Sequence, residues 1–538
     1  MPRQIRVCTL VLLLGALTLA AVADEGKEAS DLPDPAVSGY LTHDYIFVDA
    51  PQIEAYLSGL IRALLAQQGS KLPAPKFLIR SSEEFDIFTD ASKNIVISTE
   101  LLRQVGSEDE LSAALGHEIS HQILRHPQSK NAARAFPMGL DTISMIKTAA
   151  NRSQGARGVY TGNLNDVGQE SLANTQAASL IWSDIFAPAW NRKQERAADQ
   201  NGFLLMRAAG YDPASFGALF QKLHTAAGQR SARMELLKKV MLARANKSKA
   251  KKAPATQGDQ MAENLKNSLT EGAAEAIVTG LASFNREYDT PDERQKLLAE
   301  YARAHREKKL STARPVRRFK ETLRQGAGAR LLAADAAAIK TLNALTAKDM
   351  PAADKAVKSI LPATAGGRLA APHLSLAVGA WYHLHGNPQV GEQYAKAWLT
   401  AKRPPAQAYV WVAYYQAMRK EFTRSIATLE QGRTRVGNSA PFLPHLVSLA
   451  RAAGQNDKAE AYTLECLKED QKNTANRVAS LFRGKQVPSG LYADCVQRLG
   501  HEPKGADNQN AAVEAMKHPV EATKNLGEKI RGAFHRDK

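Results

Sequence analysis

His117, Glu118 and His121 have the residue types and the spacing that can hold and use a metal ion. Two histidines four residues apart lie on one face of a helix, one turn from each other, so their imidazoles can bind one Zn²⁺. Glu118 follows the first histidine, where its carboxylate can reach a water that the ion makes acidic. The pattern alone also fits two surface histidines on an ordinary helix, so a third ligand is needed to decide.

The segment that carries these residues has the features of an amphipathic helix. Ser107 and Glu110 have the spacing of a capping box, which predicts a helix start at this point. Four apolar residues then recur at every fourth position: Leu111, Leu115, Ile119 and Ile123. We therefore expect one helix over residues 107–126 that buries an apolar face and carries both histidines.

A second predicted helix, which starts near residue 191 and ends at Gly210, offers a third ligand. Glu195 and Asp199 are four residues apart and therefore lie on one face of it. Glu195 can ligate the metal, and Asp199 can accept a hydrogen bond from a ligand histidine and fix its tautomer. The alternative is a solvated pair of acids on a surface helix, but the two helices together favour one Zn²⁺ per chain.

Three short motifs of this chain resemble those of a known peptidase family. They are Gly-His-Glu-Ile-Ser-His at residues 116–121, Glu-Arg-Ala-Ala-Asp-Gln-Asn-Gly at 195–202 and Ala-Gly-Tyr-Asp-Pro at 209–213. Together they resemble the gluzincin metallopeptidases related to the CAAX prenyl protease and heat-shock protease X. The resemblance is strongest to the soluble periplasmic members that also carry tetratricopeptide repeats, and it covers roughly residues 40–310.

The resemblance implies a role for each candidate residue. His117, His121 and Glu195 correspond to the zinc ligands, Glu118 to the general base, and Asp199 to a residue that supports a ligand. It also implies an endopeptidase that cleaves unfolded, misfolded or misassembled envelope proteins. The repeats would then bind the client or the envelope assembly machinery.

Two positions depart from the family pattern, and both bear on how substrate is held. Family members often have Asn-Ala-Phe in the strand that pairs with the substrate backbone, whereas residues 86–88 here are Asp-Ile-Phe. Thr290 stands where the periplasmic relatives have a histidine that can occupy the open position of the zinc. We therefore expect no self-inhibition by that histidine. For stabilising the oxyanion, the sequence offers His224 and Arg294 as candidates.

Composition and periodicity predict a mainly α-helical chain with a small β-sheet. The resemblance implies that a zincin-like metallopeptidase domain comes first, and an α-helical, tetratricopeptide-like array is expected to follow it. At 538 residues the chain is long enough for two or three domains, and 44% hydrophobic with 6% aromatic residues is typical of Ala/Leu-rich helical proteins. Short apolar runs predict strands at residues 77–80, 85–89 and 94–98. The expected divisions are a signal peptide (1–23), the metallopeptidase domain (24–310, with a basic insertion at about 230–258), a basic connector (311–334), the array (335–480) and a tail (481–538).

The array is indicated by a repeat of 34 residues. Gly386, Lys420 and Gly454 are 34 apart and occupy equivalent predicted turns. Five residues after each turn stands a small residue: Gly391, Ser425 and Ala459. Helix-turn-helix units of this length are typical of tetratricopeptide repeats, and a generic array of helical hairpins is the alternative. Because repeats bury their cores against their neighbours, we expect the array to fold without the metallopeptidase domain.

The amino terminus has the features of an export signal. Arg3 and Arg6 precede an apolar run from Val7 to Ala20, and small residues at 21–23 form a cleavage site before Asp24. The run is short for a membrane span, so we prefer a cleaved signal and a periplasmic protein to an uncleaved anchor. Export also permits a disulfide between Cys466 and Cys495, with two buried thiols as the alternative.

The formal net charge of +17 narrows the classes of partner. We expect no nucleic acid, because the basic residues are not interleaved with aromatic residues that could stack on bases. Peripheral contact with an anionic membrane surface and plain solubility both fit the charge. Two rival functions stay open: a non-catalytic chaperone or assembly adaptor with a structural zinc, and a zinc hydrolase of cell-wall material.

Overall fold

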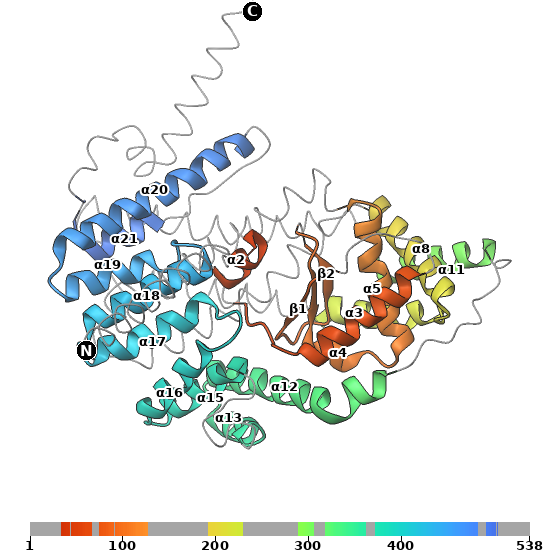
Figure 1. The fold of residues 1–538 in the computed structure, drawn as a ribbon, viewed down its shortest axis with the longest axis horizontal. Helices are drawn as coiled ribbons and strands as arrows, with labels where there is room; N and C mark the ends of the chain where they lie inside the picture. Colours follow the sequence, from red (N-terminus) through yellow and green to blue (C-terminus); the bar gives the residue numbers. More distant parts are fainter. Residues whose placement is uncertain are drawn as a thin grey trace, which may run out of the picture.

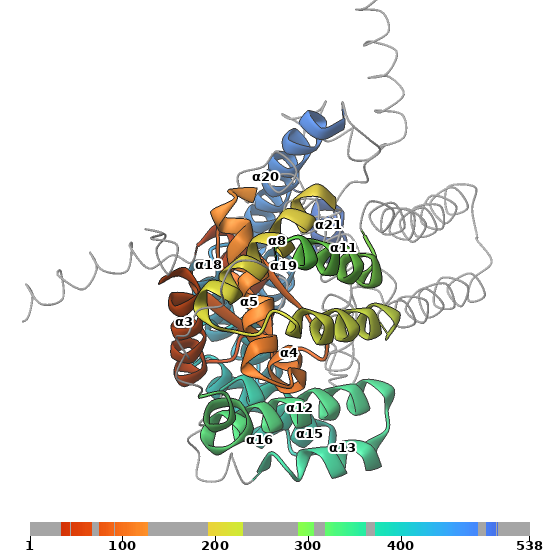
Figure 2. The ribbon, with the colours of Figure 1, turned by 90° about the vertical axis from the view of Figure 1, so that its right-hand side faces the viewer.

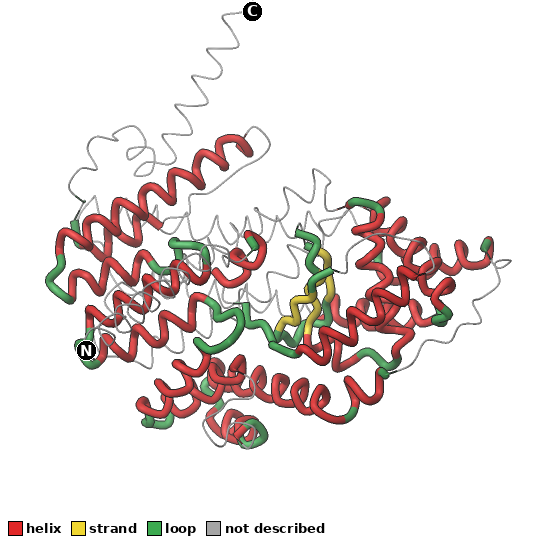
Figure 3. Tube along the Cα trace, in the orientation of Figure 1, coloured by secondary structure: helices red, strands yellow, loops and turns green. Residues whose placement is uncertain are grey.

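The computed structural model describes residues 34–42, 45–66, 75–90, 92–126, 192–229, 289–305, 318–361, 372–481, 491–501 and 503. Over these residues the fold is mainly helical with a small three-stranded sheet, which confirms that part of the expected fold class (Figure 3). The expected signal peptide and the expected basic insertion lie outside the described residues. No described helix is both long enough and apolar enough to cross a membrane.

The amino-terminal half contains the sheet and the helices that carry the candidate ligands. Its elements are α2 (Pro35–Thr42), α3 (Pro51–Leu65), β1 (Phe77–Arg80), β2 (Ile87–Thr89), β3 (Ile95–Ser98), α4 (Thr99–Gln104), α5 (Glu108–Ile123), α8 (Arg192–Ala209), a helix at residues 215–229 and α11 (Pro291–Ala304). The three expected strands and both expected metal-binding helices are thus present, with ends that differ by a few residues.

The carboxy-terminal half is a stack of helical hairpins (Figures 1 and 2). Its elements are η4 (Lys320–Arg324), α12 (Gly326–Ala347), α13 (Met350–Val357), η5 (Pro372–Leu374), α15 (Ser375–Leu384), α16 (Pro388–Trp398), α17 (Ala406–Met418), α18 (Phe422–Val436), α19 (Leu443–Ala452), α20 (Asn456–Leu481) and α21 (Leu491–Leu499). Figure 1 shows α12 running beneath the sheet and connecting the two halves.

The small sheet lies between two hydrophobic cores. The strand order is β1-β3-β2, with β1 parallel and β2 antiparallel to β3. Because neighbouring residues of a strand point to opposite faces, Ile79 and Ile97 belong to the core of α3, α5 and α8. Leu78, Phe88 and Val96 belong to a second core with α2 and the helices α17 to α21. The sheet and α2 therefore lie between the metal-binding helices and the array (Figure 1).

The 34-residue spacing corresponds to the turns of three helical hairpins. The pairs are α15 with α16, α17 with α18, and α19 with α20. Gly386, Lys420 and Gly454 lie at these turns, and all three have positive φ angles, of 79°, 61° and 73°. The prediction of equivalent turns is confirmed. Assignment of the hairpins to the tetratricopeptide class stays a prediction.

The expected boundary between residues 334 and 335 falls inside a single helix, α12. The first part of α12 packs against η4 and α4. Thr99, at the start of α4, donates a hydrogen bond to Asp335 of α12 over 2.6 Å, and both residues are buried. Residues 318–334 of the expected connector therefore form η4 and the first part of α12, which pack against α3 and α4 of the amino-terminal half.

A chain truncated after residue 334 is expected to be unstable. Truncation removes α13 to α21 and with them most of the core that covers Leu78, Phe88 and Val96 on one face of the sheet. Burial of one such side chain contributes about 1.5–3 kcal/mol to folding. We expect aggregation, or a lower thermal midpoint than that of the full chain, in size-exclusion chromatography and circular dichroism. A monomeric fragment with an unchanged midpoint would show instead that the two halves fold independently.

Part of the expected tail, residues 481–538, is a helix that packs on the array. This helix, α21, contacts α19 and α20. Cys495 of α21 forms a disulfide with Cys466 of α20, which decides between the two alternatives left open by the sequence. The disulfide holds α21 against the last hairpin, where Tyr492 and Leu499 complete the core.

Replacing both cysteines by serine is expected to lower the free energy of unfolding by about 3–4 kcal/mol. The two residues are 29 apart in sequence, and a loop of this length restricts the unfolded chain by about that amount. Urea unfolding with and without dithiothreitol measures the effect. The reductant should shift the wild type and leave the double variant unchanged. Equal insensitivity of both proteins would contradict a stabilising disulfide.

Candidate metal centre

The two helices that carry the candidate ligands cross at two glycines. α5 begins after Ser107, whose side chain accepts a hydrogen bond from the backbone N–H of Glu110, as the capping-box spacing predicts. At the crossing, Gly116 of α5 meets Gly202 of α8. A Cβ added to Gly202 would lie 3.0 Å from the backbone nitrogen of His117. The absence of side chains at this crossing lets the ligand-bearing faces of the two helices approach each other.

Alanine at position 202 is therefore expected to push α5 and α8 apart. Overpacking of this kind typically costs about 1–3 kcal/mol of stability, and the displacement should also weaken zinc binding. Gly59→Ala on α3 is the matched control, because its added Cβ would approach a single side-chain atom, of Arg62, at 4.0 Å. Thermal unfolding and competition with a zinc chelator measure the two effects. Wild-type values for Gly202→Ala would show that the close crossing is not required.

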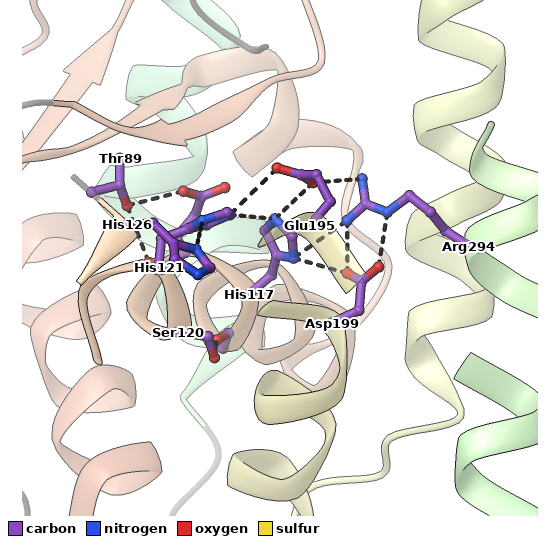
Figure 4. A network of polar contacts seen from close by, with 10 residues as sticks. Thr89, His117, Ser120, His121, His126, Glu195, Asp199 and Arg294 are labelled. Atoms are coloured by element: carbon purple, nitrogen blue, oxygen red, sulfur yellow. Dashed lines mark hydrogen bonds and ion pairs between the residues drawn. The ribbon is translucent and has the colours of Figure 1, made fainter. Parts of the chain in front are cut away.

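Three buried ligand atoms converge on one point between these helices (Figure 4). His117 Nε2 lies 3.4 Å from Glu195 Oε2, and His121 Nε2 lies 3.6 Å from Glu195 Oε1. The two Nε2 atoms are 3.0 Å apart. Tetrahedral ligands at the usual Zn–N and Zn–O distances of about 2.0–2.1 Å are separated by about 3.3–3.4 Å. The distances and the donor set therefore fit one zinc-sized ion, and the described residues contain no other such group.

A buried network of ion pairs holds His117 from the side away from the ligand position. Asp199 Oδ1 lies 2.8 Å from His117 Nδ1, so the imidazole N–H can donate to this carboxylate and leave Nε2 for the metal. Arg294 of α11 donates to both oxygens of Asp199, over 2.9 and 2.7 Å. Its Nη1 also lies 3.3 Å from Glu195 Oε2. Arg294 thus ties two acidic residues of α8 together beside the candidate metal ligands.

Ion pairs at the start of α11 hold this helix, and with it Arg294, against α8. Asp289, just before α11, binds Arg192 over 3.1 Å and Arg196 over 2.9 Å. Thr290 is the N-cap of α11 and forms a capping box with Glu293. The residue at the position of the family histidine therefore starts the helix that carries the arginine.

His126 contacts the second ligand histidine. Its Nδ1 lies 2.8 Å from His121 Nδ1, and both residues are buried. The imidazole of His126 can thus accept the Nδ1 proton of His121, which leaves Nε2 of His121 for the metal. This contact could not be inferred from helical spacing, because α5 ends at Ile123 and His126 lies beyond it.

The acidic residues make the site attractive to a cation. Burial lowers the pKa of His117, but Glu195 and Asp199 outweigh this effect and raise the pKa to about 10. Burial raises the pKa of Asp199, but Arg294 and His117 lower it below its usual value, so Asp199 stays ionised. Burial and the charge on His117 lower the pKa of His121 well below its usual value. The carboxylates that stabilise a proton on His117 can equally stabilise the charge of a bound ion.

Glu118 is buried beside the ligands, and Thr89 of β2 contacts it. The Thr89 hydroxyl lies 3.0 Å from Glu118 Oε2 (Figure 4). Burial raises the pKa of Glu118 to about 7, against the opposing effect of a charged His117. Its carboxyl group is thus close to the metal ligands but is not one of the three converging groups. The contact with Thr89 could not be predicted from sequence spacing, because Thr89 belongs to β2 and Glu118 to α5.

The other expected substrate-binding positions have structural partners. Asp86, in the segment where the family often has asparagine, is buried and pairs with Arg80 over 2.6 Å. His224 is mostly exposed and lies 3.8 Å from Asp292. Neither side chain is among the contacts of the metal centre, whereas Arg294 contacts it directly.

Comparison with known proteins agrees with this geometry. Residues 49–241 match the family model described as Peptidase family M48. The matched segment contains both ligand histidines, Glu118 and Glu195. It is a peptidase family M48 domain. Peptidases of family M48 are metal-dependent, so the M48 domain is a metallopeptidase domain, and the site between α5 and α8 is its candidate metal centre.

The M48 domain has named metalloprotease relatives. The chain is 25% identical over 261 residues to the Beta-barrel assembly-enhancing protease of Escherichia coli O157:H7, covering 44% of this chain and 50% of that protein. It is also 25% identical over 175 residues to the Mitochondrial metalloendopeptidase OMA1 of Schizosaccharomyces pombe, covering 32% of this chain and 45% of that protein. The chain therefore spans about half the length of the curated relatives that it matches.

Proposed function

We propose that this protein is a zinc endopeptidase of the cell envelope that cleaves unfolded or misassembled proteins. The observation that carries the proposal is the convergence of His117, His121 and Glu195 beside a buried glutamate, Glu118. Three protein ligands leave one tetrahedral position open, which is the arrangement of catalytic zinc sites. Zn²⁺ at this point would acidify a water and polarise the carbonyl group of a peptide bond.

The substrate is proposed to bind as an extended strand along β2. The hydrogen bonds Asp90 N to Asn94 O and Ser98 N to Asp86 O connect β2 to β3. Because such bonds alternate along an antiparallel pair, the backbone groups of Ile87 and Thr89 point away from β3. Among the described residues β2 is the outermost strand of the sheet on this side. A peptide that pairs with residues 87 and 89 would therefore lie next to α5.

Glu118 is proposed to move the proton of the reaction. Its Oε2 is engaged by Thr89, which leaves Oε1 to take a proton from the attacking water and pass it to the leaving nitrogen. Asp199 and His126 would hold the imidazoles of the two ligand histidines in place. Arg294 would hold the carboxylates of Glu195 and Asp199 in place through its ion pairs.

The proposed envelope location and choice of substrate are supported less directly than the metal centre, by a relative's name, the amino-terminal sequence and the hairpin stack. One relative is named as a protease that enhances β-barrel assembly. The amino-terminal sequence predicts export, and a stack of helical hairpins offers a surface on which a client or an assembly partner can bind. We propose that the array performs this binding, whereas the chemistry takes place between α5 and α8.

The rival function, an adaptor with a structural zinc, is less consistent with the site. Structural zinc sites usually have four protein ligands, and among the residues that the structure describes three converge here. A structural site also has no need for a buried, hydrogen-bonded Glu118 next to the ligands.

The test is cleavage of a reduced, carboxymethylated protein that cannot refold. The zinc-loaded protein should release internal peptides, which mass spectrometry identifies. A zinc chelator should stop the release, and added Zn²⁺ should restore it. Cleavage of purified cell-wall material in place of protein would favour the hydrolase alternative. If neither substrate is cleaved while zinc is bound, the adaptor function would be favoured.

A further inference from the structure

Thr89 links the outermost strand of the sheet to the glutamate of the metal centre. It is the last residue of β2 and is 3% exposed. Its hydroxyl lies 3.0 Å from Glu118 Oε2 and 3.1 Å from the Glu118 carbonyl oxygen (Figure 4). Among the described residues, it is the only side chain recorded as hydrogen-bonded to the Glu118 carboxylate.

We propose that Thr89 is a positioning residue that holds the Glu118 carboxylate in the orientation needed to take a proton. The proposal rests on the function proposed above, because it assigns Thr89 a part in the same reaction. It adds a residue that lies outside the sequence motifs of the site and belongs to the strand on which the substrate is expected to bind.

The geometry explains how one hydroxyl can fix this carboxylate. A threonine hydroxyl has one proton, and both oxygens within its reach belong to Glu118, one on the side chain and one on the backbone. Thr89 is also β-branched, so its χ1 angle is restricted, and burial prevents the hydroxyl from turning to solvent. The hydroxyl therefore links β2 to Glu118, and its one proton is donated to one of these two oxygens or shared between them.

The same residue would connect substrate position to the base. The backbone N–H and C=O of Thr89 point away from β3, while its side chain contacts Glu118. A peptide that pairs with this backbone would be placed at a set distance from the carboxylate. We therefore expect loss of the hydroxyl to lower kcat more than it raises KM, because the backbone groups that bind the peptide remain.

The experiment compares Thr89→Val, which removes the hydroxyl at nearly constant shape, with Thr89→Ser, which keeps it. We expect Thr89→Val to lower kcat about tenfold or more, with KM within about twofold and one Zn²⁺ still bound. Thr89→Ser should recover most of kcat. Thr225→Val is the matched control, because its hydroxyl bonds the Gln221 carbonyl of its own exposed helix. A wild-type kcat for Thr89→Val would overturn the proposal.

A double-mutant comparison separates positioning of Glu118 from other roles. In the Glu118→Gln background, Thr89→Val should not lower the residual rate further. A further tenfold loss there would show that Thr89 acts through the substrate or the fold, and would overturn the proposal.

Thermal unfolding of the metal-free variants gives a readout that does not depend on activity. Thr89→Val should lower the unfolding midpoint less in the Glu118→Ala background than in the wild type. If Thr89→Val lowers the midpoint equally in both backgrounds, the contact between Thr89 and Glu118 is contradicted. This test does not need peptide cleavage, so a protein that cleaves no peptide would refute the proposed function without deciding whether the contact exists.

Discussion

Glu118→Gln is expected to abolish nearly all peptidase activity while the protein still binds zinc. Glutamine has the shape of glutamate but cannot take a proton from water, and a general base contributes typically about 10²–10⁴-fold to the rate. Glu118 is not among the converging ligand groups, so its replacement should leave the zinc content at one ion per chain. Cleavage of an unfolded protein and metal analysis of the same sample measure both properties.

A matched control makes this result specific. Glu300→Gln changes an exposed glutamate of α11 in the same domain and should leave the rate unchanged. If Glu118→Gln cleaves an unfolded protein as fast as the wild type, another group must act as the base. If Glu118→Gln loses zinc together with activity, the Glu118 carboxylate contributes to metal binding in addition to the three converging ligands.

Glu195→Ala is expected to abolish tight zinc binding, because it removes the only oxygen ligand of the three. Asp199→Asn should have a smaller effect. It leaves all three ligands in place but weakens the contact that orients His117, and such changes typically cost about 10–100-fold in metal affinity or activity. Chelator competition after removal of the metal gives the two affinities. We expect the zinc affinity to be highest in the wild type, lower in Asp199→Asn and lowest in Glu195→Ala.

The same series can reject the ligand assignment. Glu300→Ala serves again as a control for loss of an exposed acid. Unchanged zinc affinity in Glu195→Ala would mean that the third ligand lies elsewhere. A larger loss in Asp199→Asn than in Glu195→Ala would exchange the roles proposed for the two residues.

Those parts of the site that depend on spacing within one helix could be predicted from the sequence. The N-cap at Ser107 and the four-residue spacing of His117 and His121 are local properties, and α5 has both. The reciprocal half of the capping box is absent there, because the Glu110 carboxylate accepts from Gly106 N. The pairing of Glu195 with these histidines could be inferred from chemistry alone, because a catalytic zinc needs a third ligand. The repeat of 34 residues likewise located the turns of the hairpins, since each hairpin contacts mainly its neighbours.

Contacts between distant elements could not be predicted in this way. Thr89 reaches Glu118 across 29 residues of sequence, and Arg294 reaches Asp199 across 95. No spacing rule connects them, because each contact depends on how a strand or a helix packs against α5 or α8. The core shared by the sheet, α2 and the array was missed for the same reason: a short strand such as β1 shows apolar residues, but not which partner covers each face.

Titration of the metal-free protein with zinc, followed by cleavage of an unfolded protein, tests the central claim most directly. One site formed by His117, His121 and Glu195 predicts that activity rises in proportion to added Zn²⁺ and stops rising at one ion per chain. Saturation at one equivalent without any peptide release would contradict the claim that this ion is catalytic. Full activity in the metal-free protein would contradict the claim that the reaction needs the ion at all.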